Sequence, residues 1–218
     1  MENKEYSLRE RKFAKTKIAI TRAFVEQFKS KRFDDISIKI VCREAEVAEG
    51  TFFNYFPGKI NVIIYYLALT SLKMIWEAKA SVSNDRYLSQ IDSIFTQLSR
   101  ELGRNNNLYY QVISVLIAQS QRPEKIAVSN LEKKLAFPNC SGIEEVNIMT
   151  LDEWFKECVI KAIKNGELPK KTNVDDVAVS LITILCGTLL ATRFHDADSC
   201  GYHYKRQLKD LWQAAVAK

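Results

Sequence analysis

Apolar residues in this chain recur every three to four positions over most of its length. That spacing is typical of amphipathic helices, whereas half-buried strands alternate apolar and polar residues. The β-branched residues follow the helical spacing too, and Gly and Pro, the residues that interrupt helices, total only eleven in 218. The pattern therefore predicts an all-α fold.

The stretch from residue 37 to residue 59 predicts two short helices that meet at a tight turn. Ser37 is suited to cap the first helix by accepting a hydrogen bond from a free amide. One face of this helix is apolar, at Ile38, Val41, Cys42 and Ala45. In the second helix Phe52 and Phe56 are four residues apart, and Pro57-Gly58 ends it. Helices this short are unstable alone, so they must pack together, leaving polar and aromatic side chains exposed to a partner.

Longer amphipathic segments surround this stretch. The segment that begins near Ser7 or Thr16 and ends at Phe28 has an apolar stripe of Ile20, Ala23, Phe24 and Phe28. Seven further helices are predicted over residues 60–80, 85–102, 108–121, 124–137, 145–165, 175–195 and 202–217. Gly103 and the asparagines at 105–107 separate the second from the third, and Gly166 is placed as a helix C-cap. The chain should hold about ten helices, three of them small.

The second short helix has the sequence Gly50-Thr51-Phe52-Phe53-Asn54-Tyr55-Phe56, with Lys59 three residues later. With residues 16–28 and 33–49, this string resembles the DNA-binding region of TetR-type (TetR/AcrR) bacterial transcriptional regulators. Members of that family usually have Gly-Thr, an apolar residue, Tyr, any residue, His or Tyr, then Phe and a trailing Lys. This chain departs from the family at Glu46, where Gly is usual in the turn, at Ala48 for a Ser cap, and at Phe53 for Tyr.

The resemblance implies two domains. Residues 1–59 would form a three-helix DNA-binding domain with a helix-turn-helix, and residues 60–218 a larger helical domain for effector binding and dimerisation. The last two helices would form the interface of a homodimer, which reads a near-palindrome with half-sites about one DNA turn apart. The candidate interface residues are Leu181, Ile184, Gly187, Thr188 and Ala191. The alternative is that this segment is a central core helix of one subunit.

The DNA contacts should divide into positioning and reading. The resemblance places Thr51, Tyr55 and Lys59 against phosphates, and their hydroxyl, phenol and ammonium groups suit that role. The candidates for base edges are Lys39, Glu49, Phe53 and Asn54. Asn pairs with adenine, Phe contacts a thymine methyl and Glu accepts from cytosine N4. Gly50 would let the helix approach the DNA backbone closely, while Phe52 and Phe56 are assigned to the core. The alternative for the exposed residues is a solvated helix face.

The charge distribution agrees with a DNA-binding end. Residues 1–59 have thirteen Lys or Arg against nine Asp or Glu, whereas residues 60–218 have nineteen against seventeen. Most of the net charge of +6 therefore lies in the first quarter of the chain. The basic residues among the first fifteen, including Lys4, form either an arm that reaches phosphates or a frayed terminus.

The larger domain should enclose a small, largely apolar effector. The candidate pocket residues are Tyr66, Phe95, Tyr110, Ile113, Trp154 and Cys158, each of which is also suited to a plain core position. The sequence does not identify the effector, and it predicts no cofactor.

Other classes of protein fit poorly. The five cysteines have no C-x-x-C pair, which favours a reducing cytoplasm over disulfides or a zinc ribbon. His195 and His203 lack metal-ligand spacing, the glycines form no phosphate loop, and no Ser or Cys is paired with a His in a pattern that signals a nucleophile and its base. The sequence therefore predicts no metal site and no catalytic residues. The start lacks a signal peptide, and the uncharged run of residues 177–192 is too short to span a membrane.

Three hypotheses follow. The first is a repressor released from a near-palindromic operator by a small effector. The second is a DNA-binding protein controlled by a protein partner, and the third is a helical enzyme or carrier of apolar molecules that merely retains the motif.

Overall fold

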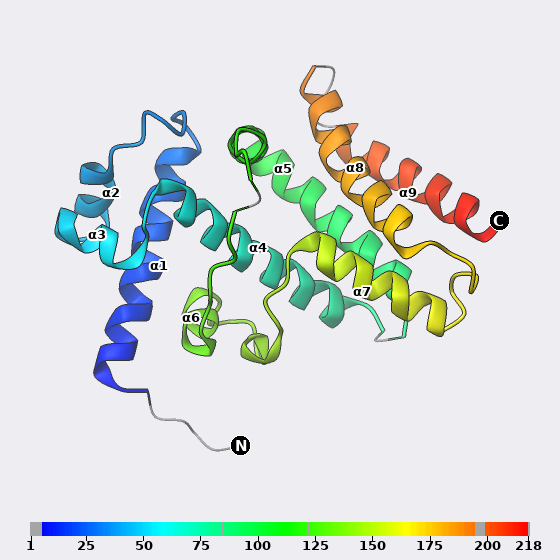
Figure 1. The fold of residues 1–218 in the computed structure, drawn as a ribbon, viewed down its shortest axis with the longest axis horizontal. Helices are drawn as coiled ribbons and strands as arrows, with labels where there is room; N and C mark the ends of the chain where they lie inside the picture. The colour runs from blue at the N-terminus through cyan, green and yellow to red at the C-terminus, as the bar shows by residue number, and fades with distance from the viewer. Residues whose placement is uncertain (1–5, 84, 122, 195–198, 218) are drawn as a thin grey trace. The chain divides into compact units, whose positions relative to one another are not determined.

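The computed structural model of the chain describes residues 6–83, 85–121, 123–194 and 199–217 (Figure 1). The regular elements in these ranges are helices. No strand occurs in these ranges, so the predicted all-α fold is confirmed. In chain order the elements are α1 (Leu8–Phe28), α2 (Ile38–Glu44), α3 (Glu49–Tyr55), α4 (Lys59–Ser81), α5 (Tyr87–Ile117), α6 (Asn130–Ala136), the 3₁₀ helix η1 (Ile143–Glu145), α7 (Leu151–Lys164), α8 (Val174–Arg193) and α9 (Cys200–Ala217).

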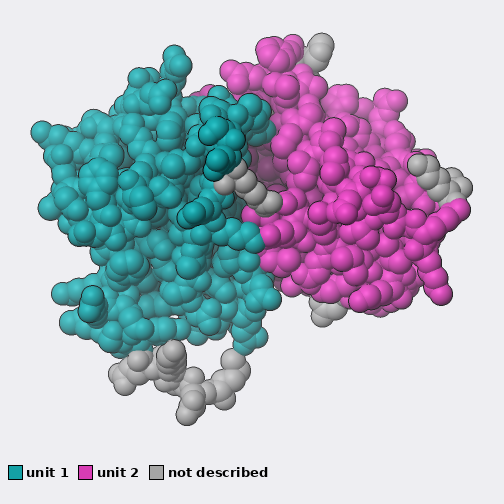
Figure 2. All heavy atoms as spheres, viewed as in Figure 1, with its two compact units in different colours: residues 1–73, 111–148 teal, residues 74–110, 149–218 magenta. Residues whose placement is uncertain are grey.

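The helices are grouped into two compact units, which Figure 2 colours separately. Unit 1 consists of residues 1–73 and 111–148, and unit 2 of residues 74–110 and 149–218. The helices α4 and α5 each supply residues to both units. Unit 1 therefore combines the region that resembles a DNA-binding domain with α6 and η1. The boundary predicted between residues 59 and 60 is a functional division and stays a prediction.

The core of unit 1 is built on α1. Its predicted stripe is confirmed, since Ile20, Phe24 and Phe28 are fully buried. The ring of Phe33 lies 6.3 Å from that of Phe24 and 6.1 Å from that of Phe28, edge to face in both cases. These aromatic contacts fold the link after α1 back onto the helix.

The helix α1 begins at the earlier of the two predicted positions. The Ser7 amide donates to Glu10 Oε2 at 2.8 Å and the Glu10 amide donates to Ser7 Oγ at 3.3 Å, which is a complete capping box. Arg9 and Lys12 therefore lie on an ordered helix turn and not on a frayed terminus, while Lys4 lies outside the described residues.

The core of unit 2 is aromatic. The ring of Phe95 on α5 stacks on that of Phe155 on α7 at 5.7 Å and meets the edge of Tyr204 on α9 at 5.1 Å. Tyr204 Oη donates to the Leu185 carbonyl at 2.9 Å, and this bond joins α9 to α8. Trp154 and Phe155 are both buried on α7, so rings from α7 and α9 meet α5 in the interior of this unit.

Two predicted helices follow one another across a kink within α5. Segments predicted over residues 85–102 and 108–121 form the single element α5, which ends at Ile117. Gly103 was expected to end the first of them but is helical, because an isolated glycine costs a helix only about 1 kcal/mol. The expected break survives as a kink at Asn105, whose φ of −146° and ψ of 50° are not helical.

Two other predicted helices start later than their apolar spacing indicates. The segment predicted over 124–137 is helical only from Asn130, and the one predicted over 145–165 only from Leu151. Each begins after a capping box: Ser129 pairs with Glu132, and Thr150 with Glu153. The sequences S-x-x-E and T-x-x-E mark these starts better than periodicity does, since capping competes with periodicity at a helix end. The other long helices agree with prediction within two residues over their described parts.

The helix α8 is long and apolar enough to cross a membrane by length and composition alone, a test that a core helix also passes. Only 28% of its apolar stretch is buried within the chain. Val179 and Leu190 are 64% and 58% exposed, so this helix presents an apolar face to a partner or to solvent.

Substitution by alanine should change the free energy of unfolding in opposite directions at Gly103, within α5, and at Gly166, just after α7. Gly166 has a φ of +79° and caps α7, as predicted, whereas Gly103 is a helical residue with open space where a methyl group would project. We expect Gly166→Ala to lower the free energy of unfolding by about 1 kcal/mol, and Gly103→Ala to raise it by up to about 1 kcal/mol. Urea unfolding at equal protein concentration measures both, and shifts of the same sign would contradict this account of the two glycines.

Candidate nucleic-acid interface

The two short helices α2 and α3 form the predicted helix-turn-helix, packed beside α1. Val41 and Cys42 on α2 and Phe52 on α3 are buried, as their spacing predicts, and Phe56 just after α3 is buried with them. Burial raises the pKa of the Cys42 thiol and the Glu49 carboxylate adds to the rise, so Cys42 packs as a neutral side chain. One expectation was wrong: Ser37 has the extended backbone of an N-cap, but its side chain makes no capping hydrogen bond.

The turn between α2 and α3 is made by Glu46 in a left-handed conformation, with a φ of 57°. The Glu46 amide donates to the Arg43 carbonyl at 3.2 Å and the Val47 amide donates to the Cys42 carbonyl at 2.9 Å. This pattern is a Schellman motif, in which glycine is the usual residue. The turn keeps the geometry that glycine would adopt, and the side chain of Glu46 adds backbone strain.

The outer face of α3 presents four of the predicted contact residues to solvent. Glu49, Gly50, Phe53 and Asn54 are exposed, and Lys39 on α2 is exposed as well. The ring of Phe53 is 59% exposed, although its edge meets Phe52 at 5.3 Å. A methyl group added at Gly50 would meet nothing within 4 Å, so neither packing nor its backbone angles explain a glycine there.

The two predicted phosphate contacts on α3 are half-buried. Thr51 lies near the start of the helix and Tyr55 at its end. The ring of Tyr55 lies 4.6 Å from that of Phe13 on α1, a contact that the sequence did not predict. Arg9 lies one helical turn before Phe13 on the same face of α1.

Lys59, the third predicted phosphate contact, has partners inside the protein. Its Nζ donates to the Asp34 carbonyl at 2.9 Å and to the Phe33 carbonyl at 3.3 Å. The same atom lies 5.8 Å from the centre of the Phe33 ring. Lys59 thus fastens the link between α1 and α2 to the start of α4, and a lysine ammonium has a third proton to offer to a phosphate.

The predicted pocket residues fall in different units. Phe95, Tyr110, Trp154 and Cys158 belong to unit 2, where all except Tyr110 are buried, while Tyr66 and Ile113 belong to unit 1. Burial raises the pKa of the Cys158 thiol to about 12, which makes it a neutral core group. Tyr110 lies under the guanidinium of Arg193 at 4.9 Å. Their role as an effector site stays a prediction.

The predicted dimer residues on α8 divide between the interior of unit 2 and the surface. Leu181 and Thr188 are buried, and Thr188 Oγ1 accepts from Gln207 Nε2 of α9 at 2.8 Å. Their side chains are used in packing within the subunit, and their place in a dimer interface stays a prediction. Gly187 and Ala191 are exposed and Ile184 is half-buried, so these three stay candidates.

Within the part of the chain that the structure describes, no three His, Cys, Asp or Glu side chains gather as a metal site would require. His195 lies outside the described residues. The five cysteines are free thiols.

Comparisons with known proteins place this arrangement among known folds. No protein-family model and no curated protein matches the sequence. Solved structures do match. FadR of Thermus thermophilus, a TetR-family transcriptional repressor in complex with lauroyl-CoA, is similar over 93% of this chain and 96% of its own, with a TM-score of 0.66 and 17% identity.

Two further structures extend the comparison. FadR of Bacillus subtilis in complex with stearoyl-CoA matches over 91% of this chain and 97% of its own, with a TM-score of 0.61 and 14% identity. The regulatory protein TetR of Rhodobacter sphaeroides matches over 89% and 96%, with a TM-score of 0.57 and 15% identity. At such identities the likeness is one of fold. The chain has the TetR-type fold, and the resemblance seen in the sequence is confirmed at that level.

The strained turn yields a prediction. Glu46→Gly should raise the free energy of unfolding by about 0.5–1 kcal/mol, because glycine adopts positive φ without strain. Glu46→Ala removes the carboxylate but keeps the strained backbone, so it should give no such gain. Urea unfolding of both variants measures the effect. An equal gain in both would assign it to the charge of Glu46 and contradict a backbone origin.

Proposed function

We propose that this chain, which has the fold of the TetR-type regulators, is a DNA-binding transcriptional regulator. The observation that carries the proposal is the outer face of α3, which exposes Phe53 and Asn54 at the end of a helix-turn-helix. Phe53 is a large apolar ring in water, and Gly50 is a glycine that the fold does not require. Both features are explained by a partner that approaches this face closely, and duplex DNA fits the surplus of cations in residues 1–59.

The contacts divide between phosphates and bases as the residue types indicate. Thr51, Tyr55 and Lys59 border the exposed face and position the duplex, whereas Asn54 and Phe53 read adenine and a thymine methyl. Glu49 and Lys39 are the remaining base-edge candidates. Arg9, one helical turn before the Phe13 that contacts Tyr55, is a further candidate for a phosphate contact.

The regulator acts as a homodimer through α8 and α9. The exposed apolar side chains of α8 support this, since Val179 and Leu190 share a face with Gly187 and Ala191. A twofold dimer presents two α3 helices to half-sites about 34 Å apart, so the operator is a near-palindrome.

The effector is a small, largely apolar molecule that releases the repressor from DNA. Two structures of similar fold were solved with lauroyl-CoA and stearoyl-CoA, and unit 2 of this chain has an aromatic interior with which such an acyl chain would be compatible. An effector of this kind acts only through a higher affinity for the arrangement that does not bind DNA. Fatty acyl-CoA is therefore the first class of molecule to test.

The protein functions in the cytoplasm and is not an enzyme.

The second candidate is a DNA-binding protein controlled by a protein partner. The exposed apolar face of α8 supports this candidate as much as it supports a homodimer, because that face would suit another protein as well as a second copy of the chain. A chain that stays monomeric while retaining DNA binding would favour this candidate.

The division of contacts predicts different behaviour for two variants. Lys59→Ala should weaken binding to all duplexes alike and lower the slope of log K against log salt by about one unit per subunit, since one phosphate contact is lost. Asn54→Ala should leave that slope unchanged and relax the preference at one base pair. Binding to duplexes selected from random sequence by the wild-type chain, compared with unselected duplexes, measures both effects.

The matched control is Lys171→Ala, which removes one exposed charge from unit 2 and should change neither quantity. Measurements are made well below the melting temperature, because Lys59 also holds the carbonyls of Phe33 and Asp34. If Lys59→Ala and Asn54→Ala alter the salt slope and base preference identically, the division is wrong.

The dimer interface is tested by placing a charge on the exposed face of α8. Leu190→Glu should convert the dimer to a monomer and weaken operator binding by at least about 100-fold, since a carboxylate cannot be buried unpaired. Ile160→Glu alters a residue on α7 that is 42% exposed and should leave the dimer intact. Sedimentation velocity determines the oligomeric state. A Leu190→Glu variant that sediments as the wild-type chain does would reject α8 as the interface.

A further inference from the structure

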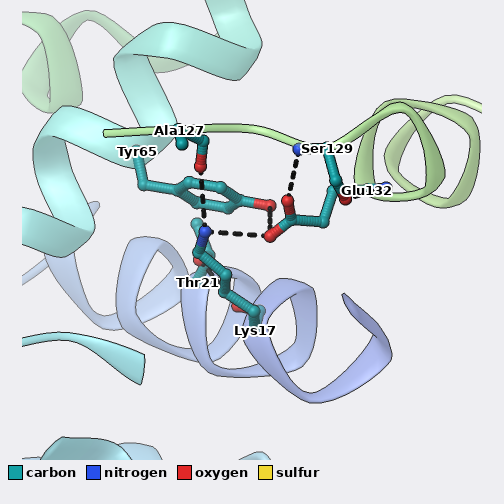
Figure 3. A network of polar contacts seen from close by, with 6 residues as sticks. All are labelled: Lys17, Thr21, Tyr65, Ala127, Ser129 and Glu132. Atoms are coloured by element: carbon teal, nitrogen blue, oxygen red, sulfur yellow. Dashed lines mark hydrogen bonds and ion pairs between the residues drawn. The ribbon is translucent and has the colours of Figure 1, made fainter. Parts of the chain in front are cut away.

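A single buried carboxylate joins three helices of unit 1 (Figure 3). Glu132 Oε1, on α6, lies 2.9 Å from Lys17 Nζ on α1 and accepts from Tyr65 Oη on α4 at 3.2 Å. The other oxygen, Oε2, accepts from the Ser129 amide at 2.6 Å, which is half of the capping box that starts α6. One side chain therefore both begins α6 and attaches it to α1 and α4.

The ammonium of Lys17 is well partnered in this cluster. Besides Glu132, its Nζ donates to the Ala127 carbonyl at 3.1 Å and lies 4.2 Å from the centre of the Tyr65 ring. Lys17 and Glu132 are only 6% and 3% exposed. Charges so deeply buried are tolerated because each is paired and hydrogen-bonded.

This arrangement favours one position of α6 over all others. Two apolar side chains of similar volume would pack at least as well as the ion pair, but they would tolerate small shifts between the helices. A shift that separates Lys17 from Glu132 leaves two charges unpaired in the interior. Separating the two charges therefore costs more free energy than a small shift between apolar side chains would.

The cluster is connected by direct packing to both the core and the end of α3. The Tyr65 ring meets Phe56 at 5.6 Å, and Phe56 meets Phe52, the buried anchor of α3, at 6.0 Å. On α1, Lys17 lies one turn after Phe13, whose ring contacts Tyr55 at the end of α3. The exposed face of α3 thus rests on the same two helices that bind Glu132.

We propose that Glu132, Lys17 and Tyr65 form a latch that couples the start of α6 to the DNA-reading helix α3. Glu132 and Lys17 are positioning residues: they do not touch DNA, but they hold α1 and α4 where α3 matches its half-site. Opening of residues 123–133 releases the latch and weakens DNA binding. The inference rests on the proposed DNA-binding function, and coupling of this kind is reciprocal, so bound DNA stabilises the first turn of α6.

The first test replaces the latch by an apolar pair. Lys17→Met combined with Glu132→Leu keeps the volume and avoids an unpaired charge, so the fold should persist, although the Tyr65 hydroxyl and the Ser129 amide lose an acceptor. We expect this double variant to bind the duplex selected by the wild-type chain about tenfold more weakly, with an unchanged salt slope, because no phosphate contact is lost. A double variant that folds and binds with wild-type affinity would show that the ion pair is only structural and would overturn the proposal.

The matched control is Lys133→Met. Lys133 is as buried as Lys17 and lies on the same helix as Glu132, but its Nζ donates to the carbonyls of Glu144 and Val146, at η1 and just beyond it. The control should loosen the contact between α6 and η1 but keep the contacts of Glu132, so affinity for the selected duplex should stay within about twofold of wild type. A tenfold loss in the control too would assign the effect to general loosening and overturn the latch.

The second test uses the wild-type chain and so does not depend on how any variant folds. Hydrogen exchange is measured with and without the selected duplex at the amides of Ser129, Glu132 and Lys133, which are hydrogen-bonded at the start of α6. The reciprocal coupling predicts that exchange slows by about tenfold on DNA binding, although α6 is not part of the proposed DNA-binding face. Unchanged exchange there would overturn the proposal, whereas a wild-type chain that binds no duplex at low salt would instead refute the DNA-binding function on which it rests.

Discussion

Seven residues of helix cannot hold their own shape in water, and this constraint governs both α2 and α3. The two helices keep their form because Val41, Phe52 and Phe56 are buried against the rest of unit 1. The Phe56 ring in turn packs on Tyr65, whose hydroxyl is held by Glu132. The position of the exposed face of α3 thus depends on the packing of these buried side chains.

The first compact unit extends beyond the helix-turn-helix. Residues 111–148 belong to it, and they supply the carboxylate that fixes α1 and α4. Residues 111–148, although distant in sequence, therefore help to hold α3 in place. A change that breaks the contacts of Glu132 with Lys17 and Tyr65 would therefore also alter the support of α3.

Much of the fold could be predicted from local spacing. The stripes of α1 and α2 and the end of α7 at Gly166 follow from periodicity and capping chemistry, which act over a few residues. The late start of α6 at Asn130 was missed although Ser129 and Glu132 carry the capping signature. The burial of Glu132 could not have been predicted, because its partner Lys17 is more than one hundred positions away and the ion pair exists only in the folded chain.

The candidate site was predicted to a similar degree. The exposure of Phe53 and Asn54 follows from helical spacing once Phe52 and Phe56 are assigned to the core. The bonds of Lys59 to two carbonyls, and the burial of Thr188 against Gln207, depend on segments that are distant in sequence or on a neighbouring helix. Fold similarity alone does not establish function, so DNA binding is inferred from the exposed face of α3.

The most direct test of that inference is selection of duplexes from random DNA by the full chain at low salt. A twofold dimer that reads DNA through α3 should enrich an inverted repeat whose half-site centres lie about one helical turn, roughly 10–10.5 base pairs, or a multiple of that spacing, apart. Affinity for the enriched duplex should fall steeply as salt is raised. Failure to retain any duplex above background, or retention without an enriched sequence, would contradict the central claim that this helix-turn-helix reads DNA.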